Sequence, residues 1–459
     1  MVDSEIKQTL KVFKNYRIET NMKEYISEKT PKTFRYGVKN TLSKRILIIL
    51  FILSLNIQVS ICDNPVITIK IKKGQNSIIN SGFKNYISEV SINNISQTNI
   101  DTKYNFEEHE NTVKILLNSQ ISNFDKMFCD CNNIYEIAFE NFDSSVITKF
   151  QEVSKNCNQL RSIDLSDWDI SGVSTIFGLF QNCNSITSIK LPNFENSKLQ
   201  SLSSAFCCCH SLTSLDVTRF DTSQVTKMQQ TFLECHSLTS LDLSKFNTSK
   251  LQIVEAMFSG CEKITSLDLS NFDTSHITNF QEFLKNMHSL VYLNISNFNT
   301  SSARNMDRMF SHCSSMTSFD LTHFDTSHVT NMHKMFSECF SLVYLNISNF
   351  DTSNVQTMDY MFSNGFSLRF LDLSSFTMEK MSDITYMFNN TPNLEFINLT
   401  NAKPSQNIKI NEIFKGTPKN LIICTNSEVI SQKIDSSFCG FVSCSENWKA
   451  EQKKNFCRY

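Results

Sequence analysis

Glycine, proline and tryptophan are scarce in this chain, with 9, 6 and 2 residues among 459, which excludes a string of linkers. The sequence also lacks the phosphate-binding pattern G-x-x-x-x-G-K, the zinc-protease pattern H-E-x-x-H and the nucleophile pattern G-x-S-x-G. Outside the basic residues 1–45 the chain is mildly acidic, whereas nucleic-acid binding requires clustered lysine and arginine. We therefore expect neither an enzyme nor a nucleic-acid-binding protein, and we expect no cofactor.

One apolar run, residues 46–55, follows the basic residues Lys44 and Arg45. Its length of about ten residues is short for a membrane span, which needs about 20, and fits the core of a secretory signal. We expect residues 46–62 to be a signal peptide cleaved before Asp63. The alternatives are an uncleaved signal anchor, which would leave the arm 1–45 in the cytosol of a type II membrane protein, and a buried helix of a soluble domain.

Phenylalanine, by contrast, is abundant, with 38 residues, and recurs at a spacing of 26. One series runs from Phe142 to Phe376, and its central members are Phe220, Phe246, Phe272, Phe298, Phe324 and Phe350. A second series runs from Phe128 to Phe414, and a cysteine series with the same spacing includes Cys209, Cys235 and Cys261. A fixed period of this length is typical of a solenoid, in which each unit hides its apolar face against the next.

Within a unit, Leu238, Leu241 and Leu243 have the L-x-x-L-x-L spacing of a leucine-rich-repeat strand. Residues 221–223 can cap a helix, and Val225, Met228 and Phe232 then share one helical face. The fold class predicted is α/β: a leucine-rich-repeat solenoid with a parallel β-sheet on one face and short α- or 3-10 helices on the other.

The expected organisation has an array of 26-residue units at residues 128–402, between two caps. Residues 63–127 contain alternating strand patterns and should cover the first unit. Residues 403–459 should form a C-terminal cap. Its four cysteines could form two disulfides with three possible connectivities, and they are Cys424, Cys439, Cys444 and Cys457.

The unit F-[DN]-T-S-x-V-T-x-M-x-x-M-F-x-x-C-x-S-L-x-x-L-x-L-S-x resembles that of the BspA-type leucine-rich-repeat surface proteins of bacteria and protists, over residues 128–402. Leu284 and Met287 depart from it. The resemblance implies a secreted or cell-surface protein that binds protein, matrix or glycoconjugate ligands on host or neighbouring cells, with no catalytic residues. The alternative is an intracellular protein-interaction scaffold, which free thiols throughout the chain would favour.

The exposed side of the strands is the predicted ligand-binding face. Its middle row contains Asp216, Asp242, Asp268, Asp320 and Asp372, and a second row changes from serine to aromatic residues at Tyr292, Tyr344, Phe370 and Phe396. Exposed aromatic residues are typical anchors for partners, unless the C-terminal cap covers them. The aspartates could meet a cation or a basic ligand, or could hydrogen-bond neighbouring serines in a hydrated row. N-x-S/T glycosylation acceptors at Asn294 and Asn346 lie on this face, and sugars there would compete with a ligand.

The cysteine series is expected to be a stack of buried free thiols, with disulfides between units and a metal site as the alternatives. The run from Cys207 to His210 contains three cysteines and a histidine. Adjacent residues of an extended chain point to opposite sides, and zinc motifs use C-x-x-C spacing. We therefore expect no metal.

Overall fold

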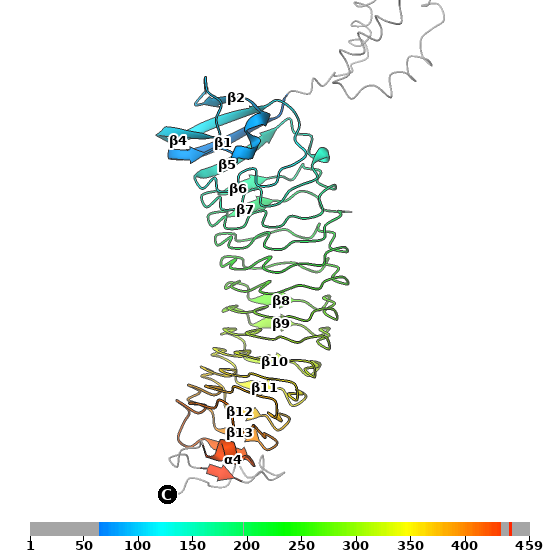
Figure 1. The fold of residues 1–459 in the computed structure, drawn as a ribbon, viewed down its shortest axis with the longest axis vertical. Coiled ribbons are helices and arrows are strands. Elements are labelled where there is room, and N and C mark those ends of the chain that lie inside the picture. The colour runs from blue at the N-terminus through cyan, green and yellow to red at the C-terminus, as the bar shows by residue number, and fades with distance from the viewer. Residues whose placement is uncertain (1–63, 196, 433–439, 443–459) are drawn as a thin grey trace, which may run out of the picture. The chain divides into compact units, whose positions relative to one another are not determined.

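The computed structural model describes residues 64–195, 197–432 and 440–442. Figure 1 shows coils of chain stacked one on another between an N-terminal sheet and the last strands. The coils form a solenoid with parallel strands, so the predicted solenoid and parallel sheet are confirmed.

The N-terminal sheet contains β1 (Val66–Ser77), β2 (Ile87–Ile92), β3 (Ile95–Ser96), β4 (Lys103–Leu117) and β5 (Ile134–Glu140), with the 3-10 helix η3 (Ser81–Tyr86) between β1 and β2. Its order is β3-β2-β4-β1-β5. Ile67, Ile69 and Ile71 alternate inward along β1 and are fully buried. Strand β5 pairs antiparallel with β1 and parallel with the first strand of the coils, so it joins the sheet to the solenoid.

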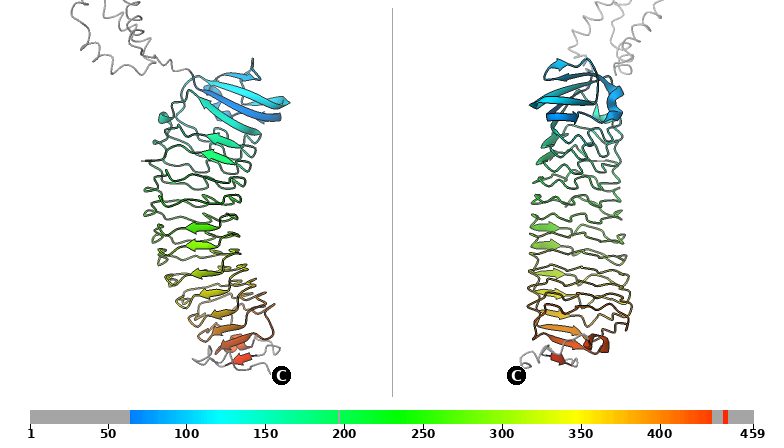
Figure 2. Two further views of the ribbon diagram at one scale, coloured as in Figure 1. Left: turned by 180° about the vertical axis from the view of Figure 1, so that it is seen from behind. Right: turned by 60° about the vertical axis from the view of Figure 1, so that its left-hand side comes forward.

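Each coil contributes one short strand to the strand face. These strands are β6 (Ser162–Asp164), β7 (Ser188–Lys190), β8 (Ser266–Asp268), β9 (Tyr292–Asn294), β10 (Ser318–Asp320), β11 (Tyr344–Asn346), β12 (Phe370–Asp372), β13 (Phe396–Leu399), β14 (Ile422–Thr425) and β15 (Gly440–Val442). From β6 to β14, paired residues are 26 apart, as in Ser266 with Tyr292. Figure 2 shows that the strands share one side of the stack. Residues 214–216 and 240–242 occupy the same place in the repeat without forming regular strands.

The predicted helices on the other face are wrong. Among described residues 147–426 none is helical, and the helical segments η4 (Ser144–Val146) and α4 (Glu428–Ser431) flank that range. Val225, Met228 and Phe232 are buried as a helical face would require, but the segment is a series of turns. The N–H groups of Met228 and Phe232 donate to oxygens 25 residues ahead in the next coil, at 2.8 and 3.0 Å.

Left-handed backbone explains why a helix does not form. Gln230 and Glu234 have φ of 56° and 54°, and the corresponding residues of the other coils repeat these values. A right-handed helix requires negative φ and a hydrogen bond from each N–H to the fourth residue before it. Between the left-handed positions, alternate N–H groups bond within the coil instead, as Thr231 does to the Met228 oxygen at 3.3 Å.

The core between the two faces contains both phenylalanine series. The rings of Phe206, Phe232 and Phe258 stack at centroid distances of 5.8 and 5.7 Å, nearly parallel. The central members of the other series are between 1% and 4% exposed, and they are Phe220, Phe246, Phe272, Phe298, Phe324 and Phe350. Burying one such side chain stabilises the fold by about 1.5–3 kcal/mol, so the stacked rings hold neighbouring coils together.

Candidate binding surface

The aspartate row of the strand face is built from turns that end the strands. Asp216, Asp242 and Asp268 are exposed, and one carboxylate oxygen of each accepts a hydrogen bond from the N–H two residues on, at 2.9 to 3.0 Å. These bonds lower the pKa of all three carboxyls, because they favour the ionised form. The row is thus bonded to neighbouring residues, and whether it also meets a cation or a basic ligand stays a prediction.

Two members of the row vary this arrangement. Asp320 is exposed and accepts from Thr322, which lowers its pKa in the same way. Asp372 is half-buried and accepts from the N–H of Ser374 at 3.1 Å and from the amide of Asn398 at 2.9 Å. The row is therefore held by local hydrogen bonds along its length.

Aromatic exposure on the strand face is concentrated at two coils. Tyr292 and Tyr344 are 55% and 62% exposed, and their neighbours Val291 and Val343 are 65% and 46% exposed. Residue Ser318 of β10 pairs with Tyr344 and occupies the rung between the two tyrosines. We call Val291, Tyr292, Val343 and Tyr344 the tyrosine strip.

The aromatic row changes character beyond the tyrosine strip. Phe370 is half-buried, with the Arg369 guanidinium carbon 5.8 Å from its ring centroid. Phe396 is only 4% exposed, so it is not the exposed residue that the predicted binding face requires. It pairs with Ile422 of β14, which lies in the segment 403–459 that was predicted to form the C-terminal cap. The contact surface available to a partner therefore ends near Phe370.

The cysteine series consists of buried thiols that are free of disulfides. Each thiol from Cys157 onward donates to a main-chain oxygen 29 residues earlier, as Cys235 does to Phe206 at 3.2 Å and Cys261 to Phe232 at 3.2 Å. Burial raises the pKa of Cys261 and Cys339 to about 12, so both are neutral donors. Cys209 has the same contact with Phe180 at 3.3 Å. The spacing of cysteines in the sequence indicated the burial but not this bond between coils.

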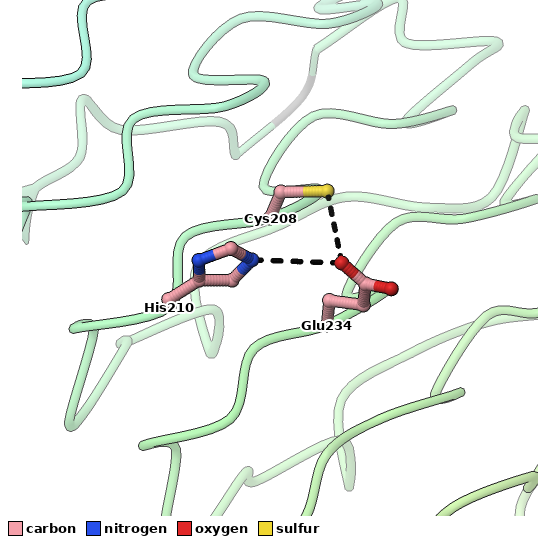
Figure 3. Close-up of side chains that lie close together, drawn as sticks. All are labelled: Cys208, His210 and Glu234. Carbon is pink, nitrogen blue, oxygen red and sulfur yellow. Dashed lines mark hydrogen bonds and ion pairs between the residues drawn. The ribbon is translucent and has the colours of Figure 1, made fainter.

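A cluster at the edge of two coils contains two residues of the run Cys207 to His210, for which the sequence predicted no metal, together with a residue that the sequence analysis did not consider. Cys208, His210 and Glu234 place their ligand atoms within 4.8 Å of one another (Figure 3). Adjacent residues do point apart, but Cys208 and His210 are two residues apart and share a side. Glu234 follows Cys208 by one 26-residue period, so the solenoid itself brings the third group into place.

Two predictions fall wholly or partly outside the described residues. The expected signal or anchor, residues 46–62, and the tail cysteines Cys439, Cys444 and Cys457 are not among them. Cys424 is disulfide-bonded, and the pairing within the tail stays a prediction. In the part of the chain that the structure describes, no helix has the length and apolar character of a membrane span.

Comparison with known proteins places the repeats in a described family. A family with the description "Mycoplasma protein of unknown function, DUF285" matches four overlapping segments, residues 98–215, 200–319, 256–344 and 305–423, which together cover more than two thirds of the chain. No curated protein matches the chain.

Several solved structures are similar at low identity. A leucine-rich repeat protein from Bacteroides ovatus is 18% identical, with a TM-score of 0.29 over 58% of this chain and 79% of that one. The Toll–Spatzle complex of Drosophila gives 16% identity and a TM-score of 0.27, over 61% of this chain and 39% of that one. The functional domain of InlJ from Listeria monocytogenes, which includes a cysteine ladder, gives 16% identity and a TM-score of 0.14, over 59% and 69%.

Proposed function

This chain belongs to the DUF285 family, whose description assigns no function, and from the geometry of its strand face we propose that it is a binding protein that contacts a protein or glycoconjugate ligand through the tyrosine strip. The observation that carries the proposal is the exposure of Tyr292 and Tyr344 on one side of a rigid stack. Exposed apolar and aromatic groups that lie close together are more frequent at interaction sites than on the rest of a protein surface.

The surroundings of the tyrosine strip suit a partner with polar groups. The strip is adjacent to Asp268, Asp320 and Asn346, whose side chains are already positioned by hydrogen bonds to the backbone. Tyrosine loses little conformational entropy on binding, and its hydroxyl can hydrogen-bond at the edge of a contact. A preformed row of polar groups around aromatic anchors is the usual composition of a protein interface.

We place this activity outside the cytosol, as a secreted or surface-anchored adhesion protein. The support is the apolar run at residues 46–55 behind a basic arm, together with the resemblance of the repeat unit to BspA-type surface proteins. Surface labelling of intact cells, with sequencing of the mature N-terminus, tests this location. An N-terminus at Asp63 supports cleavage, whereas an intact arm supports the type II anchor.

The binding role is tested with the triple variant Tyr292→Ser, Tyr344→Ser and Phe370→Ser. Its binding to arrays of purified matrix proteins and glycans is compared with that of the parent chain. We expect the affinity for any ligand of the parent to fall at least about 30-fold, the loss of roughly 2 kcal/mol typical of an aromatic anchor. Phe366→Ser is the matched control, because Phe366 is also 39% exposed but stacks on Phe340, away from the strand face. Unchanged affinity in the triple variant would contradict the proposal.

One observation favours an intracellular scaffold as a second candidate. Eleven described cysteines are free, which is the usual state of thiols in a reducing compartment. Most of them are buried, however, so their burial also accounts for the free thiols. The labelling experiment on intact cells separates the two candidates, since only an external protein is labelled.

A further inference from the structure

The cluster of Cys208, His210 and Glu234 occupies a corner of the coil where side chains of successive coils meet. Cys208 and Glu234 are one period apart, and both have left-handed backbone, with φ of 60° and 54°. At the corresponding corner of other coils the side chains bond directly. The Asn182 amide donates to Asn156 at 2.7 Å, and Asn390 donates to Asn364 at 2.7 Å.

At the cluster, other side chains occupy this corner, and their distances to Glu234 are longer than these amide hydrogen bonds. Cys208 Sγ lies 3.7 Å from Glu234 Oε2, and His210 Nε2 lies 3.5 Å from the same oxygen. The Nε2 atom is shielded from solvent and makes no hydrogen bond. By contrast, His312 occupies the place of Cys208 four coils further on, and its Nε2 atom lies 2.8 Å from Glu338 Oε2. Both contacts end on the same oxygen of Glu234, and the three ligand atoms lie within 4.8 Å of one another (Figure 3).

The two separations from Glu234 Oε2 are those of neighbouring ligands around a tetrahedral metal ion. Zinc binds sulfur at about 2.3 Å and histidine nitrogen or carboxylate oxygen at about 2.0–2.2 Å, so neighbouring ligand atoms lie roughly 3.3–3.8 Å apart. The mixed set of thiol, imidazole and carboxylate also selects the metal. Calcium and magnesium require oxygen ligands, whereas zinc accepts all three groups.

We propose that Cys208, His210 and Glu234 bind one zinc-class divalent transition-metal ion. Cys208 and His210 belong to one coil and Glu234 to the next, so the ion links two coils through side chains. The fourth position is open to water. The Cys207 sulfur lies 3.1 Å from that of Cys208, closer than two sulfur ligands of one tetrahedral ion would lie, so Cys207 is not counted as a ligand. The ion has a structural role here: it adds a link between coils to those made by the buried thiols and the phenylalanine rings.

The neighbouring coil supports His210 from one side. The His236 ring lies 4.7 Å from the His210 ring, and His236 Nδ1 lies 3.2 Å from the Gly260 oxygen and 3.1 Å from Glu262 Oε1. The Nδ1 atom of His236 therefore contacts groups outside the cluster. Ring contacts of this kind fix the orientation of a ligating imidazole, as outer-shell partners do in known metal sites.

The test uses the full chain, stripped of metal with a chelator and titrated with Zn²⁺ by calorimetry and with Co²⁺ by absorption spectroscopy. We expect a site of one ion per chain that depends on the cluster, a thiolate-to-cobalt charge-transfer band, and a rise in melting temperature on adding Zn²⁺. Cys208→Ser should abolish the charge-transfer band. Cys208→Ser and Glu234→Gln should each weaken Zn²⁺ binding by about 100-fold or more, since even outer-shell changes cost 10–100-fold.

Cys129→Ser is the matched control. Cys129 is also half-buried, and its sulfur lies 3.4 Å from Asp130 Oδ2, but it is outside the cluster, so its replacement should leave both titrations unchanged. Circular dichroism shows that each variant is folded. The proposal is overturned if folded Cys208→Ser binds Zn²⁺ as the parent does, or if the parent binds none at micromolar concentration.

Discussion

The sulfur of Cys235 lies 3.2 Å from the main-chain oxygen of Phe206 in the preceding coil, and the N–H of Cys209 donates to that same oxygen at 3.2 Å. One carbonyl thus joins a turn within its own coil to a side chain of the next. The thiol bond to the preceding coil repeats at Cys261, Cys313 and Cys339. The cysteine series therefore contributes hydrogen bonds as well as filling space.

Removing one of these thiols should destabilise the solenoid. We expect Cys261→Ala to lower the free energy of unfolding by about 1–2 kcal/mol, because it removes a buried donor and leaves a small cavity. Cys261→Thr should lose less, since Thr391 occupies the equivalent place and donates to the Phe388 oxygen at 2.8 Å. Urea denaturation measures both variants. Equal losses would show that a hydroxyl-bearing side chain of similar volume does not replace the thiol.

The left-handed positions should tolerate glycine and resist a new side chain. Gly260 has φ of 77°, and a Cβ there would lie 3.1 Å from Glu234 Cα, so Gly260→Ala should cost about 1–2 kcal/mol. Ala256 has φ of 52° in the same coil, so Ala256→Gly relieves backbone strain and should cost less. Thermal melting of the two variants provides the comparison. A larger loss for Ala256→Gly would show that left-handed strain is not the controlling effect.

Acid should destabilise the protein partly through the aspartate row. The folded chain lowers the pKa values of Asp216, Asp242, Asp268 and Asp320 below the ordinary 3.8, so their contribution to stability is present above about pH 4 and is lost as the pH falls through the folded values. Asp164, with Lys190 Nζ at 2.7 Å, has the pKa lowered to about 2 and loses its contribution last.

Replacing the four aspartates by asparagine is the control for this pH dependence. Asn294 and Asn346 make the same turn bond with Ser296 and Ser348, each at 3.3 Å, so the fold should be kept. The free energy of unfolding, measured from pH 5 to pH 2, should fall less steeply in the fourfold variant than in the parent. Identical slopes would show that other carboxyls account for acid unfolding.

The stacked rings should be the most sensitive positions. Phe232 lies between Phe206 and Phe258 and is 1% exposed, so Phe232→Ala should cost about 3–5 kcal/mol. Phe232→Leu should cost clearly less, because Leu284 fills the equivalent place in another coil and is fully buried. Denaturation curves distinguish the two. A small loss for alanine would mean that the coils close around the missing ring.

Much of the solenoid could be predicted because the same pattern of apolar residues recurs in many units. Most units place Phe, Leu and Cys at the same three points, so a spacing of 26 sufficed to identify which side chains are buried. The strand positions followed from alternation, as at Ser266 to Asp268. The six central members of the first phenylalanine series are buried, whereas Phe142 at its start is half-buried.

The turns were mispredicted as helices because few units carry the glycines that would indicate left-handed backbone. Left-handed backbone usually calls for glycine, yet Gln230, Glu234 and Ala256 occupy these positions, and Gly260 is a rare indication. The spacing of Val225, Met228 and Phe232 fits a helix and a series of turns equally well, since both bury the same residues. Only the hydrogen bonds to the next coil distinguish them.

The cluster at Cys208 could have been found from the sequence in one way. Adding one period of 26 to Cys208 gives Glu234, and adding it to His210 gives His236, so residues far apart in the chain become neighbours. Searching for a metal motif within a single segment misses a site whose ligands come from two coils.

The uniform register between coils has a consequence for how such a gene changes. Every unit offers the next the same backbone donors and acceptors, 25 and 26 residues apart. Unequal crossing-over between repeats in the DNA deletes or duplicates whole units and leaves a junction that fits as before. A shift of one codon, by contrast, misaligns the contacts between the altered unit and its neighbours. The number of coils can therefore change from one gene copy to the next, whereas the number of residues in each coil is fixed by the register.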